Sequence, residues 1–421
     1  MEHLLSLVKK ILPSPIANAL RSVWHPTLSF FSALFYGFPA RKLTIIGING
    51  TKGKSTTAEM MFAILEHAGH PTALASTIRF AIGEQSTPNI FKMTMPGRGY
   101  VQSFLKKAVA HGATHAVVEL TTEGAREWRH RFLSLNALVM LNVQKEHIER
   151  FGSFENYVKA KWWLVRELER SKKHNRSIVV NVEKENAEFL NASVENQLPF
   201  SKNELEGIAS TEHKTTFTYK NVRFTIPIAG EFNALNALSA LKVAEQLGIP
   251  LEVARDGLAS MQKVQGRLEL VEQGQPFHVV VDYAHTPDSL SALYSAFPTQ
   301  RKICVLGNTG GGRDTWKRPL MGEIADTHCD VVILTNEDPY DEDPKKILQE
   351  MTATMKRAPI IELDRRRAIA RALSEACAGD VVLISGKGTD PYIMEAHGKK
   401  TPWSDVSVVK EELTQLTKKT V

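Results

Sequence analysis

A glycine-rich segment between an apolar run and a helix-like run constrains the fold of this chain most strongly. Residues 43–47 are typical of a buried strand, residues 55–68 of a helix, and they are joined by GINGTKGKST, residues 47–56. At such a junction, backbone N–H groups and the positive end of the helix can hold phosphate oxygens. The segment departs from GxxxxGK[ST], because Ile48 stands five residues before Gly53. It still predicts a phosphate-binding loop.

Alternating strand-like and helical runs extend this pattern along the chain. The other strand-like runs before residue 263 are residues 115–120, 137–143 and 177–182, with a hairpin at 215–228. A second series follows, with strands beginning near residues 278, 302, 330, 360 and 380. Strands that alternate with helices predict an α/β fold with mostly parallel sheets. We expect a short apolar segment (1–40), a central P-loop ATPase domain with a parallel sheet (41–263) and a C-terminal doubly wound, Rossmann-like domain (264–421).

Composition excludes several classes of protein. Hydrophobic residues make up 43% of the 421 residues and charged residues 23%, which is ordinary globular usage and excludes bulk disorder. The net charge of +6 comes from scattered basic residues, so no nucleic-acid partner is expected. The three cysteines, Cys304, Cys329 and Cys377, form no CxxC pair. We therefore expect neither a disulfide framework nor a zinc ribbon, and a reducing cytoplasm fits best.

The N-terminal segment raises the question of a membrane. Residues 28–38 are apolar and aromatic, but they are fewer than the roughly 20 residues that a spanning helix needs, and no signal peptide is apparent. Two interpretations stay open. The segment is either a helix packed on the protein or an interfacial segment, whose apolar side chains enter lipid beside basic residues at the inner membrane surface. The residues concerned are Phe30, Phe31, Leu34 and Phe35, with Lys9, Lys10 and Arg21.

Several motifs in order resemble the Mur ligase family. GTKGKST (50–56) resembles the phosphate loop of Mur ligases and of the related folylpolyglutamate synthases. NVQKEH (142–147), followed by Gly152, Tyr157, Ala160 and Lys161, is similar to the stretch Nxx[D/E]H…G…Y..AK, with one extra residue. GEFNALNAL (230–238) and VQGRLE (264–269) are similar to GxFNxxNxL and VxGRxE. DYAHTPD (282–288), GGRD (311–314) with KRP (317–319), and GKG (386–388) are typical of the MurE-like branch, which adds the third peptide residue of peptidoglycan precursors.

The resemblance implies an ATP-dependent, ADP-forming amide ligase. In such enzymes ATP phosphorylates a peptide carboxylate, and the amine of an amino acid attacks the acyl phosphate. Metal ions best neutralise the charge that gathers there. By resemblance, two Mg²⁺ ions would be held by Ser55, Glu119, His147 and Lys161, the last as a carbamate made with CO₂.

Further residues are assigned by the same resemblance. ATP would contact Gly50, Thr51, Lys52, Gly53, Lys54, Ser55, Thr56, Asn233, Asn236, Arg267, Asp282 and His285. Lys54, Arg313 and Lys317 would supply positive charge where the acyl phosphate forms, with a solvated surface position as the alternative for Lys317. Since ATP would bridge two domains, the linker at 263–267 is the expected hinge.

Taken alone, each of these residues also has a structural interpretation. Glu119 would be a solvated charge at a strand end, and His147 a hydrogen-bonded structural residue. Lys161, beside two tryptophans, would be a snorkelling helix residue, with Lys159 as the alternative carbamate site. Asn233 and Asn236 would be helix caps.

Three departures from the family concern the substrate. Only about 40 residues precede the ATPase domain, where the usual Mur ligase holds its UDP-sugar. Residues 121–124, TTEG, replace a Ser-Ser-His run. Glu337-Asp338-Pro339-Tyr340 replaces the family's DNPR, whose Arg binds the distal carboxylate of diaminopimelate. Acidic residues at 337–343 would suit a cationic substrate such as lysine or ornithine, or form a solvated loop. The substrate candidates are Asp338, Tyr340, Gly386 and Asp390, the last at the position of a family Glu that meets the amine.

The leading hypothesis is a Mur-type ligase that joins an amino acid to a peptide carboxylate in cell-wall precursor synthesis. A lipid-linked rather than UDP-linked acceptor is the main alternative, motivated by the aromatic segment at residues 30–38. A folylpolyglutamate synthase is disfavoured by DYAHTPD and GGGRD together. A non-catalytic ATP-binding subunit is disfavoured by the intact set Lys54, Ser55, Glu119, His147 and Lys161. The sequence leaves the amino acid, the acceptor and the oligomeric state open.

Overall fold

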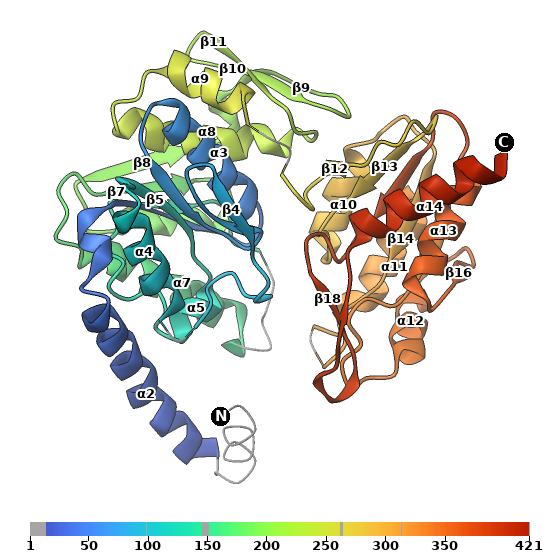
Figure 1. Ribbon diagram of the computed structural model, residues 1–421, viewed down its shortest axis with the longest axis horizontal. Helices are drawn as coiled ribbons and strands as arrows, with labels where there is room; N and C mark the ends of the chain where they lie inside the picture. The colour runs from blue at the N-terminus through green and yellow to red at the C-terminus, as the bar shows by residue number, and fades with distance from the viewer. Residues whose placement is uncertain (1–13, 98, 145–150, 262–263, 313, 421) are drawn as a thin grey trace. The chain divides into compact units, whose positions relative to one another are not determined.

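The computed structural model describes residues 14–97, 99–144, 151–261, 264–312 and 314–420 (Figure 1). The chain divides into two compact units. One contains residues 1–50, 68–143 and 155–199, and the other contains residues 51–67, 144–154 and 200–421. The expected residues His147 and Arg313, and the linker residue Lys263, lie outside the described residues, as do Lys9 and Lys10.

The first unit is built on an eight-stranded sheet with the strand order β4-β3-β2-β5-β1-β6-β7-β8. Strands β2, β5, β1, β6 and β7 are parallel, while β3 and β4 form an antiparallel edge that we did not expect from the sequence. β6 and β7 are buried along their whole length, as expected of parallel strands covered on both faces. The strands are β1 (Thr44–Asn49), β2 (Thr72–Ala75), β3 (Arg79–Ile82), β4 (Gln85–Pro88), β5 (His115–Glu119), β6 (Ala137–Met140), β7 (Ser177–Asn181) and β8 (Asn196–Phe200).

Helices accompany this sheet. They are α2 (Ser14–Phe35), α4 (Tyr100–Ala110), α5 (Thr122–Arg126) and α7 (Phe154–Glu169), with 3-10 turns η1 (Pro39–Lys42) and η2 (Lys184–Asn191). In α7, Tyr157, Ala160, Leu164, Val165 and Leu168 are buried at helical spacing, which is the pattern of an amphipathic helix with one face on a core. Lys161 lies within this buried face. No described helix is long and apolar enough to cross a membrane.

The second unit contains a helical layer and a small sheet. α3 (Lys54–His67) packs against α8 (Phe232–Gln246) and α9 (Leu251–Ala259). The three-stranded sheet has the order β11-β10-β9, with β9 at Glu206–Ser210, β10 at Thr215–Tyr219 and β11 at Val222–Ile226. Lys220 and Asn221 join β10 to β11 with positive φ angles of 48° and 63°, as in a tight two-residue hairpin turn. The hairpin expected at residues 215–228 is therefore confirmed.

The second unit also contains a six-stranded sheet with the order β12-β13-β17-β14-β15-β16. Its strands are β12 (Glu269–Leu270), β13 (His278–Val281), β14 (Lys302–Leu306), β15 (Val331–Leu334), β16 (Ile360–Ile361) and β17 (Val381–Ile384), all parallel except β12. A short hairpin of β18 (Tyr392–Met394) and β19 (Lys400–Pro402) follows, and η3 (Lys202–Glu204) and η4 (Ala396–Gly398) are 3-10 turns.

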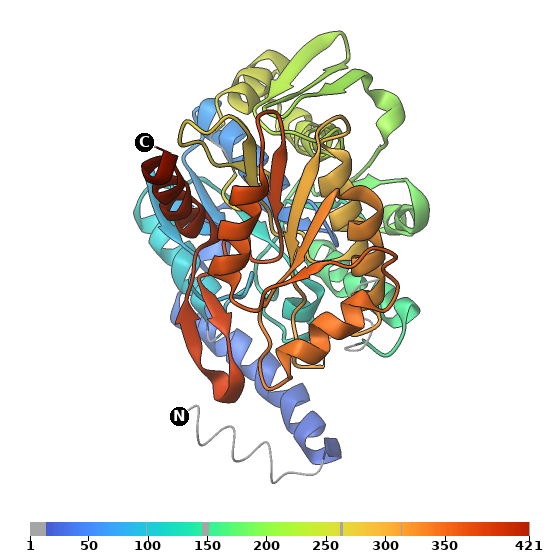
Figure 2. The ribbon, with the colours of Figure 1, turned by 90° about the vertical axis from the view of Figure 1, so that its right-hand side faces the viewer.

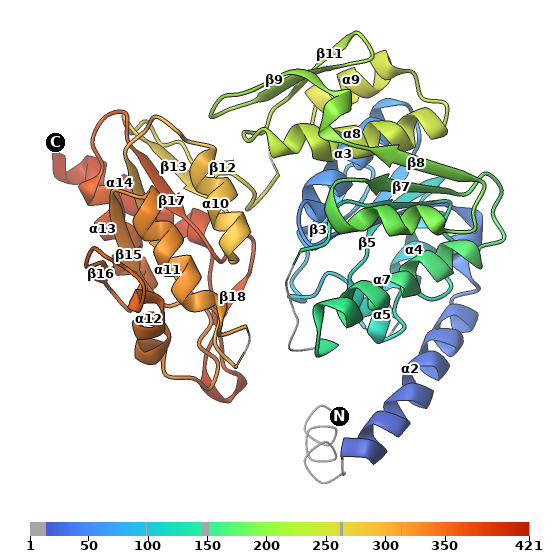
Figure 3. The same cartoon turned by 180° about the vertical axis from the view of Figure 1, so that it is seen from behind.

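Helices cover both faces of this sheet (Figures 2 and 3). Alternate strand residues such as Val280 and Leu383 pack on one side with α10 (Pro287–Ser295), α11 (Lys317–His328) and α12 (Pro344–Thr352). Their neighbours Val281 and Ile384 pack on the other side with α13 (Arg365–Glu375) and α14 (Asp405–Thr420). The expected doubly wound fold is confirmed, with the central parallel strands β14 and β17 buried along their whole length between two helical layers.

One disulfide was not anticipated from the cysteine count. Cys304 on β14 is bonded to Cys329, just before β15, with a Cα–Cα distance of 6.2 Å and both residues buried. Cys377 is free and exposed. A sequence separation of 25 residues does not reveal the pairing, because only the parallel alignment of β14 and β15 brings the two cysteines together.

Candidate active site

The glycine-rich loop leaves the end of β1 and leads directly into α3. Gly53 has a φ of 82°, and a Cβ atom there would collide with the Asn236 amide oxygen, so only glycine fits. The Lys54 ammonium donates to the carbonyl of Thr51 at 3.1 Å, and the Thr51 hydroxyl accepts from the Gln144 N–H at 3.0 Å. The first turn of α3 contains no acidic residue. Its positive end is therefore available to an anion without competition from a carboxylate on the same turn.

Asn233 and Asn236 lie inside α8 rather than at its cap. Both side chains are buried; the Asn236 amide donates to Asn233 Oδ1 at 2.9 Å, and Asn233 donates to the carbonyl of Ala229 at 2.7 Å. The capping interpretation is therefore wrong for these two residues. Because Asn236 packs against Gly53, the pair helps to shape the glycine-rich loop.

Glu119 ends β5 and is fully buried, not solvated. It lies opposite Ile48 of β1, two residues before Gly50 of the loop. The Thr77 N–H donates to Oε1 at 3.2 Å and the Thr77 hydroxyl donates to Oε2 at 2.7 Å. Two hydrogen bonds leave lone pairs on a carboxylate free to bind a cation. Thr77 was missed in the sequence, because it lies 42 residues from Glu119 and belongs to none of the motifs.

Lys161 is also fully buried, so the snorkelling interpretation is wrong. Its ammonium donates to Asn49 Oδ1 at 2.9 Å and lies 4.8 Å from the centre of the Tyr157 ring. The same Asn49 side chain donates to the carbonyl of Leu120 at 2.8 Å. Asn49 therefore ties Lys161 to the strand end that carries Glu119. Lys159, the alternative carbamate site, is exposed.

Each unit offers oxygen ligands of the kind that Mg²⁺ prefers. The first unit has the buried Glu119 carboxylate, and the second has the hydroxyl of Ser55, which is buried in the first turn of α3. Within the described residues, no three His, Cys, Asp or Glu side chains are grouped to hold a metal. The expected set is of a different kind, since it combines a hydroxyl, one carboxylate and a modified lysine with His147, which is not described.

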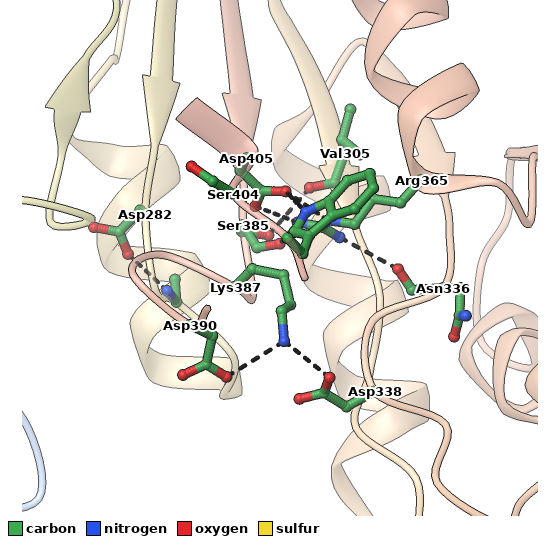
Figure 4. A network of polar contacts seen from close by, with 12 residues as sticks. Asp282, Val305, Asn336, Asp338, Arg365, Ser385, Lys387, Asp390, Ser404 and Asp405 are labelled. Atoms are coloured by element: carbon green, nitrogen blue, oxygen red, sulfur yellow. Dashed lines mark hydrogen bonds and ion pairs between the residues drawn. The ribbon is translucent and has the colours of Figure 1, made fainter. Parts of the chain in front are cut away.

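A second group of predicted residues gathers where the parallel strands of the six-stranded sheet end. Lys387, after β17, is completely buried and donates to Asp338 Oδ1 at 2.8 Å and to the carbonyl of Tyr392 at 2.6 Å (Figure 4). Asp390 lies 3.4 Å from the same ammonium. Asp338 also accepts from the Met394 N–H at 2.7 Å. In open α/β sheets, ligands bind at this carboxyl edge.

A buried ion pair lies beside this edge of the sheet. Arg365 and Asp405 form two hydrogen bonds of 2.8 and 2.7 Å, and Arg365 donates further to the carbonyl of Ser385 at 2.8 Å (Figure 4). The geometry is bidentate and both residues are buried, so the loop after β17 is held rigidly. We did not single out either residue in the sequence.

The residues after β13 form a third part of this edge. Asp282 is half-buried and accepts from the N–H groups of Leu268 and Ala284, both at 2.7 Å. Burial raises its pKa, although the Arg267 guanidinium opposes that shift. The negative charge of Asp390 and burial raise the pKa of Tyr283 well above its usual value, so its hydroxyl stays protonated.

Two further cations adjoin this segment. Arg267 lies over the Tyr283 ring, 4.5 Å from its centre. Lys317 is buried, not surface-solvated, and donates to the carbonyl of His285 at 3.0 Å. The predicted residues Arg267, Asp282, His285 and Lys317 therefore lie in one region of the unit.

Most of the acidic residues between 337 and 343 have hydrogen-bond or ion-pair partners elsewhere in the same unit. Asp338 pairs with Lys387, Glu342 with Arg318, and Asp343 caps α12 through the Lys345 N–H. Asp341 accepts from the His397 N–H at 2.7 Å. The run is therefore not a uniform cation-binding loop.

Glu337 differs from these acids. It is only 3% exposed, and its Oε1 accepts from the Thr309 hydroxyl at 2.7 Å. Within the part of the chain that the structure describes, its Oε2 has no hydrogen-bond partner. Gly386 lies against that oxygen so closely that a Cβ atom would collide with it. A buried carboxylate oxygen without a partner is costly, so this position favours a bound cation or donor.

Comparison with known proteins identifies the family. Residues 48–244 match the Mur ligase middle domain, and residues 266–388 match the Mur ligase, glutamate ligase domain. The UDP-N-acetylmuramoyl-L-alanyl-D-glutamate--2,6-diaminopimelate ligase of Caldanaerobacter subterraneus subsp. tengcongensis is 34% identical over 400 residues, which cover 90% of this chain and 80% of that protein. The UDP-N-acetylmuramyl-tripeptide synthetase of Roseiflexus sp. is 33% identical, over 92% of this chain and 82% of its own.

A solved structure agrees with this assignment. The structure of a UDP-N-acetylmuramoyl-L-alanyl-D-glutamate--2,6-diaminopimelate ligase is 26% identical, with a TM-score of 0.59, over 89% of this chain and 79% of that chain. The match spans both of the sheets described above. Two matched domains and relatives that align over nine-tenths of the sequence show that this chain belongs to the Mur ligases, the ATP- and Mg²⁺-dependent amide ligases of peptidoglycan precursor synthesis.

Proposed function

We propose that this Mur ligase joins an amino acid with a second amine, and with no second carboxylate, to the peptide carboxylate of a UDP-N-acetylmuramyl dipeptide. Lysine and ornithine have this chemistry. The relatives act, by their names, on UDP-N-acetylmuramyl peptides, and several of them add 2,6-diaminopimelate. The proposal keeps their reaction and changes the amino acid.

The observation that carries the proposal is the buried carboxylate of Glu337. Its Oε2 faces Gly386, and no described group donates to it. An ammonium group of the substrate would satisfy this oxygen with a charge-assisted hydrogen bond. Asp390 adds a second negative charge beside Lys387 on the neighbouring loop. These two acids and the buried Gly386 backbone are the proposed amino-acid pocket.

Tyr340 supports the absence of a distal carboxylate. It stands where the resemblance places an arginine, and its phenol has no cationic fork to bind a carboxylate in bidentate fashion. Its own backbone is fixed, with a φ of 53° and its N–H donating to the carbonyl of Met394 at 3.0 Å. Diaminopimelate would therefore bring a second carboxylate to a region that already holds Glu337 and Asp390.

For the activation step we propose the following roles. The glycine loop holds the ATP phosphates through its N–H groups, and Lys54 and Ser55 reach the terminal phosphates and the metal. Glu119, His147 and carbamylated Lys161 would hold Mg²⁺, whose positive charge would offset that of the phosphates. Arg267, Asp282 and His285 are the proposed ATP contacts of the six-stranded sheet, and Arg313 and Lys317 the proposed cations beside the acyl phosphate.

The carbamate is supported by the position of Lys161. A fully buried side chain between the Asn49 amide and the Tyr157 ring is poorly placed for solvation of an ammonium, and carbamylation replaces this buried cation with an anionic oxygen ligand. We also propose that the domain boundaries fall at residues 40 and 263 and that the protein acts in the cytoplasm.

The test is amino-acid-dependent ADP release with UDP-N-acetylmuramyl-L-alanyl-D-glutamate and a panel of lysine, ornithine and diaminopimelate. We expect lysine or ornithine to be used and diaminopimelate to be poor. Glu337→Gln should raise the KM for the preferred amino acid about 10- to 100-fold, the loss expected for one charge-assisted hydrogen bond. Asp341→Asn is the matched control, because this exposed acid lies in the same loop.

The two parts of the proposal fail differently. Preferential use of diaminopimelate, or an unchanged KM in Glu337→Gln, would show that the pocket is misassigned while the ligase reaction stands. If the protein bound ATP but released no ADP with any amino acid, the proposed acceptor, UDP-N-acetylmuramyl-L-alanyl-D-glutamate, would instead be wrong.

A further inference from the structure

The N-terminal helix α2 has its bulky apolar side chains on the outside. Phe35 is 79% exposed and Trp24 61%, and Val23, Phe30, Phe31 and Leu34 are also exposed. At 100° per residue these positions fall on one side of the helix. A helix of a soluble domain normally turns its apolar stripe towards the core. In α2 the apolar stripe faces away from the unit to which the helix belongs.

Small and polar residues face the unit instead. Ala33 is completely buried, and the Ser29 hydroxyl donates to the carbonyl of Trp128 at 2.8 Å. Ser32 lies against Gly99 so closely that a Cβ atom there would collide with its hydroxyl. Phe30, at the border, touches Phe132 with the ring centres 5.9 Å apart. The helix is therefore docked through small residues, and its exposed aromatic face is a consequence of that docking.

Positive charge is concentrated in the same segment. Residues 1–42 contain five Lys or Arg residues and one acidic residue, a net charge of +4 out of +6 for the whole chain. The acid is Glu2, and the cations are Lys9, Lys10, Arg21, Arg41 and Lys42. Arg41 and Lys42 lie at the C-terminal end of the helix region and are exposed. One-tenth of the sequence thus carries two-thirds of the net charge.

We infer that α2 binds the surface of an anionic lipid bilayer and lies in the interface without crossing it. An apolar, aromatic helix face with basic residues around it is the chemistry that such a surface selects. A second copy of the chain fits less well, because the two faces would bring two +4 segments together. The helix extends outward from the eight-stranded sheet, so its exposed face is accessible (Figures 1 and 3). This inference goes beyond the ligase activity and does not depend on the amino acid proposed.

The experiment is flotation of the full chain with vesicles of phosphatidylcholine, with and without phosphatidylglycerol. We expect binding to the anionic vesicles that weakens as salt is raised, because salt screens the attraction between basic side chains, such as the exposed Arg41 and Lys42, and the headgroups. Phe31→Ser/Phe35→Ser should lower the partition coefficient at least about tenfold, since it removes two large apolar side chains. Ile361→Ser, which removes an exposed apolar side chain from β16, is the matched control and should bind like the unaltered chain.

Circular dichroism and amino-acid-dependent ADP release would show that the variants are folded. Three results would overturn the inference. They are no binding to anionic vesicles at low salt, binding that Phe31→Ser/Phe35→Ser leaves unchanged, and a dimer in sedimentation velocity that the same double variant abolishes while vesicles bind neither protein. The last result would assign the aromatic face to a second copy.

Discussion

The end of β1 and the carboxyl edge of the six-stranded sheet are both places where parallel strands stop and polar residues begin, but they are built differently. Around β1 the charged groups are few and held by neutral partners: Glu119 by Thr77, and Lys161 by Asn49. At the other edge the charges neutralise one another, as in Lys387 with Asp338 and Arg365 with Asp405.

This difference separates two tasks. A charged group whose hydrogen-bond partners are neutral is not neutralised within the protein, so its electrostatic field can act on a ligand. This suits phosphates and metal ions, which bring their own charge into the site in every catalytic cycle. Charges already paired within the protein instead fix backbone positions, and only an unmatched member such as Glu337 is left for specificity. Substitutions at β1 should therefore change turnover, and substitutions at the second edge should divide into those that change substrate affinity and those that change stability.

The largest effect is expected from Lys54→Ala. Removing this cation from the phosphate loop should lower kcat by about 10²- to 10³-fold, because the terminal phosphates lose a positioned positive charge. Stability should change little, since Lys54 is only half-buried and its ammonium donates to the carbonyl of Thr51 in its own loop. Steady-state ADP release and thermal melting measure the two quantities.

Lys106→Ala is the control for this substitution, because it removes an exposed lysine from α4 with the same change in net charge. A kcat within about threefold of the control would refute the role given to Lys54.

Lys161→Ala should have the next largest effect. Loss of a metal ligand should lower kcat at least about 100-fold, while Lys159→Ala, two residues away and exposed, should leave it unchanged. An independent readout is the mass of the Lys161 peptide after trapping in the presence of bicarbonate. We expect an increase of about 44 Da, the mass of CO₂. A consistently unmodified lysine, together with normal turnover in Lys161→Ala, would rule out the carbamate.

The two regions were not equally predictable from the sequence. The glycine loop and Lys161 could be singled out because each belongs to a short motif of the resembled family, and Glu119 because the resemblance points to the end of a strand-like run. Their supporting residues, Thr77 and Asn49, could not be found, since side-chain hydrogen bonds across 42 and 112 residues leave no local pattern. Most of the parallel strands were also predicted, as apolar runs, whereas the short parallel strand β2 and the polar, exposed edge strand β4 were not.

At the second edge the acidic residues are apparent in the sequence, but their pairing is not. The sequence does not distinguish the five acidic residues between 337 and 343 from one another. Only the tertiary structure shows that Arg318 and Lys387, from distant elements, pair with two of them. The Cys304–Cys329 bond was missed for the same reason. Local periodicity predicts elements, whereas partners are chosen by the topology that joins them.

Glu342→Gln should have the smallest effect and would sharpen the distinction within the acidic run. Arg318 holds Glu342 through two hydrogen bonds of 2.8 and 2.9 Å and lowers its pKa to about 2. Since this folded pKa is below the unfolded value, the stabilisation is complete above about pH 4.5 and is lost as pH falls towards 2. We expect the free energy of unfolding at pH 7 to fall by about 1–2 kcal/mol, with the difference from the unaltered chain shrinking in acid. Urea unfolding at several pH values measures this difference, and the KM for the amino acid should stay constant. A raised KM would show instead that Glu342 belongs to the substrate pocket, and the contrast drawn here between Glu337 and its acidic neighbours would then be wrong.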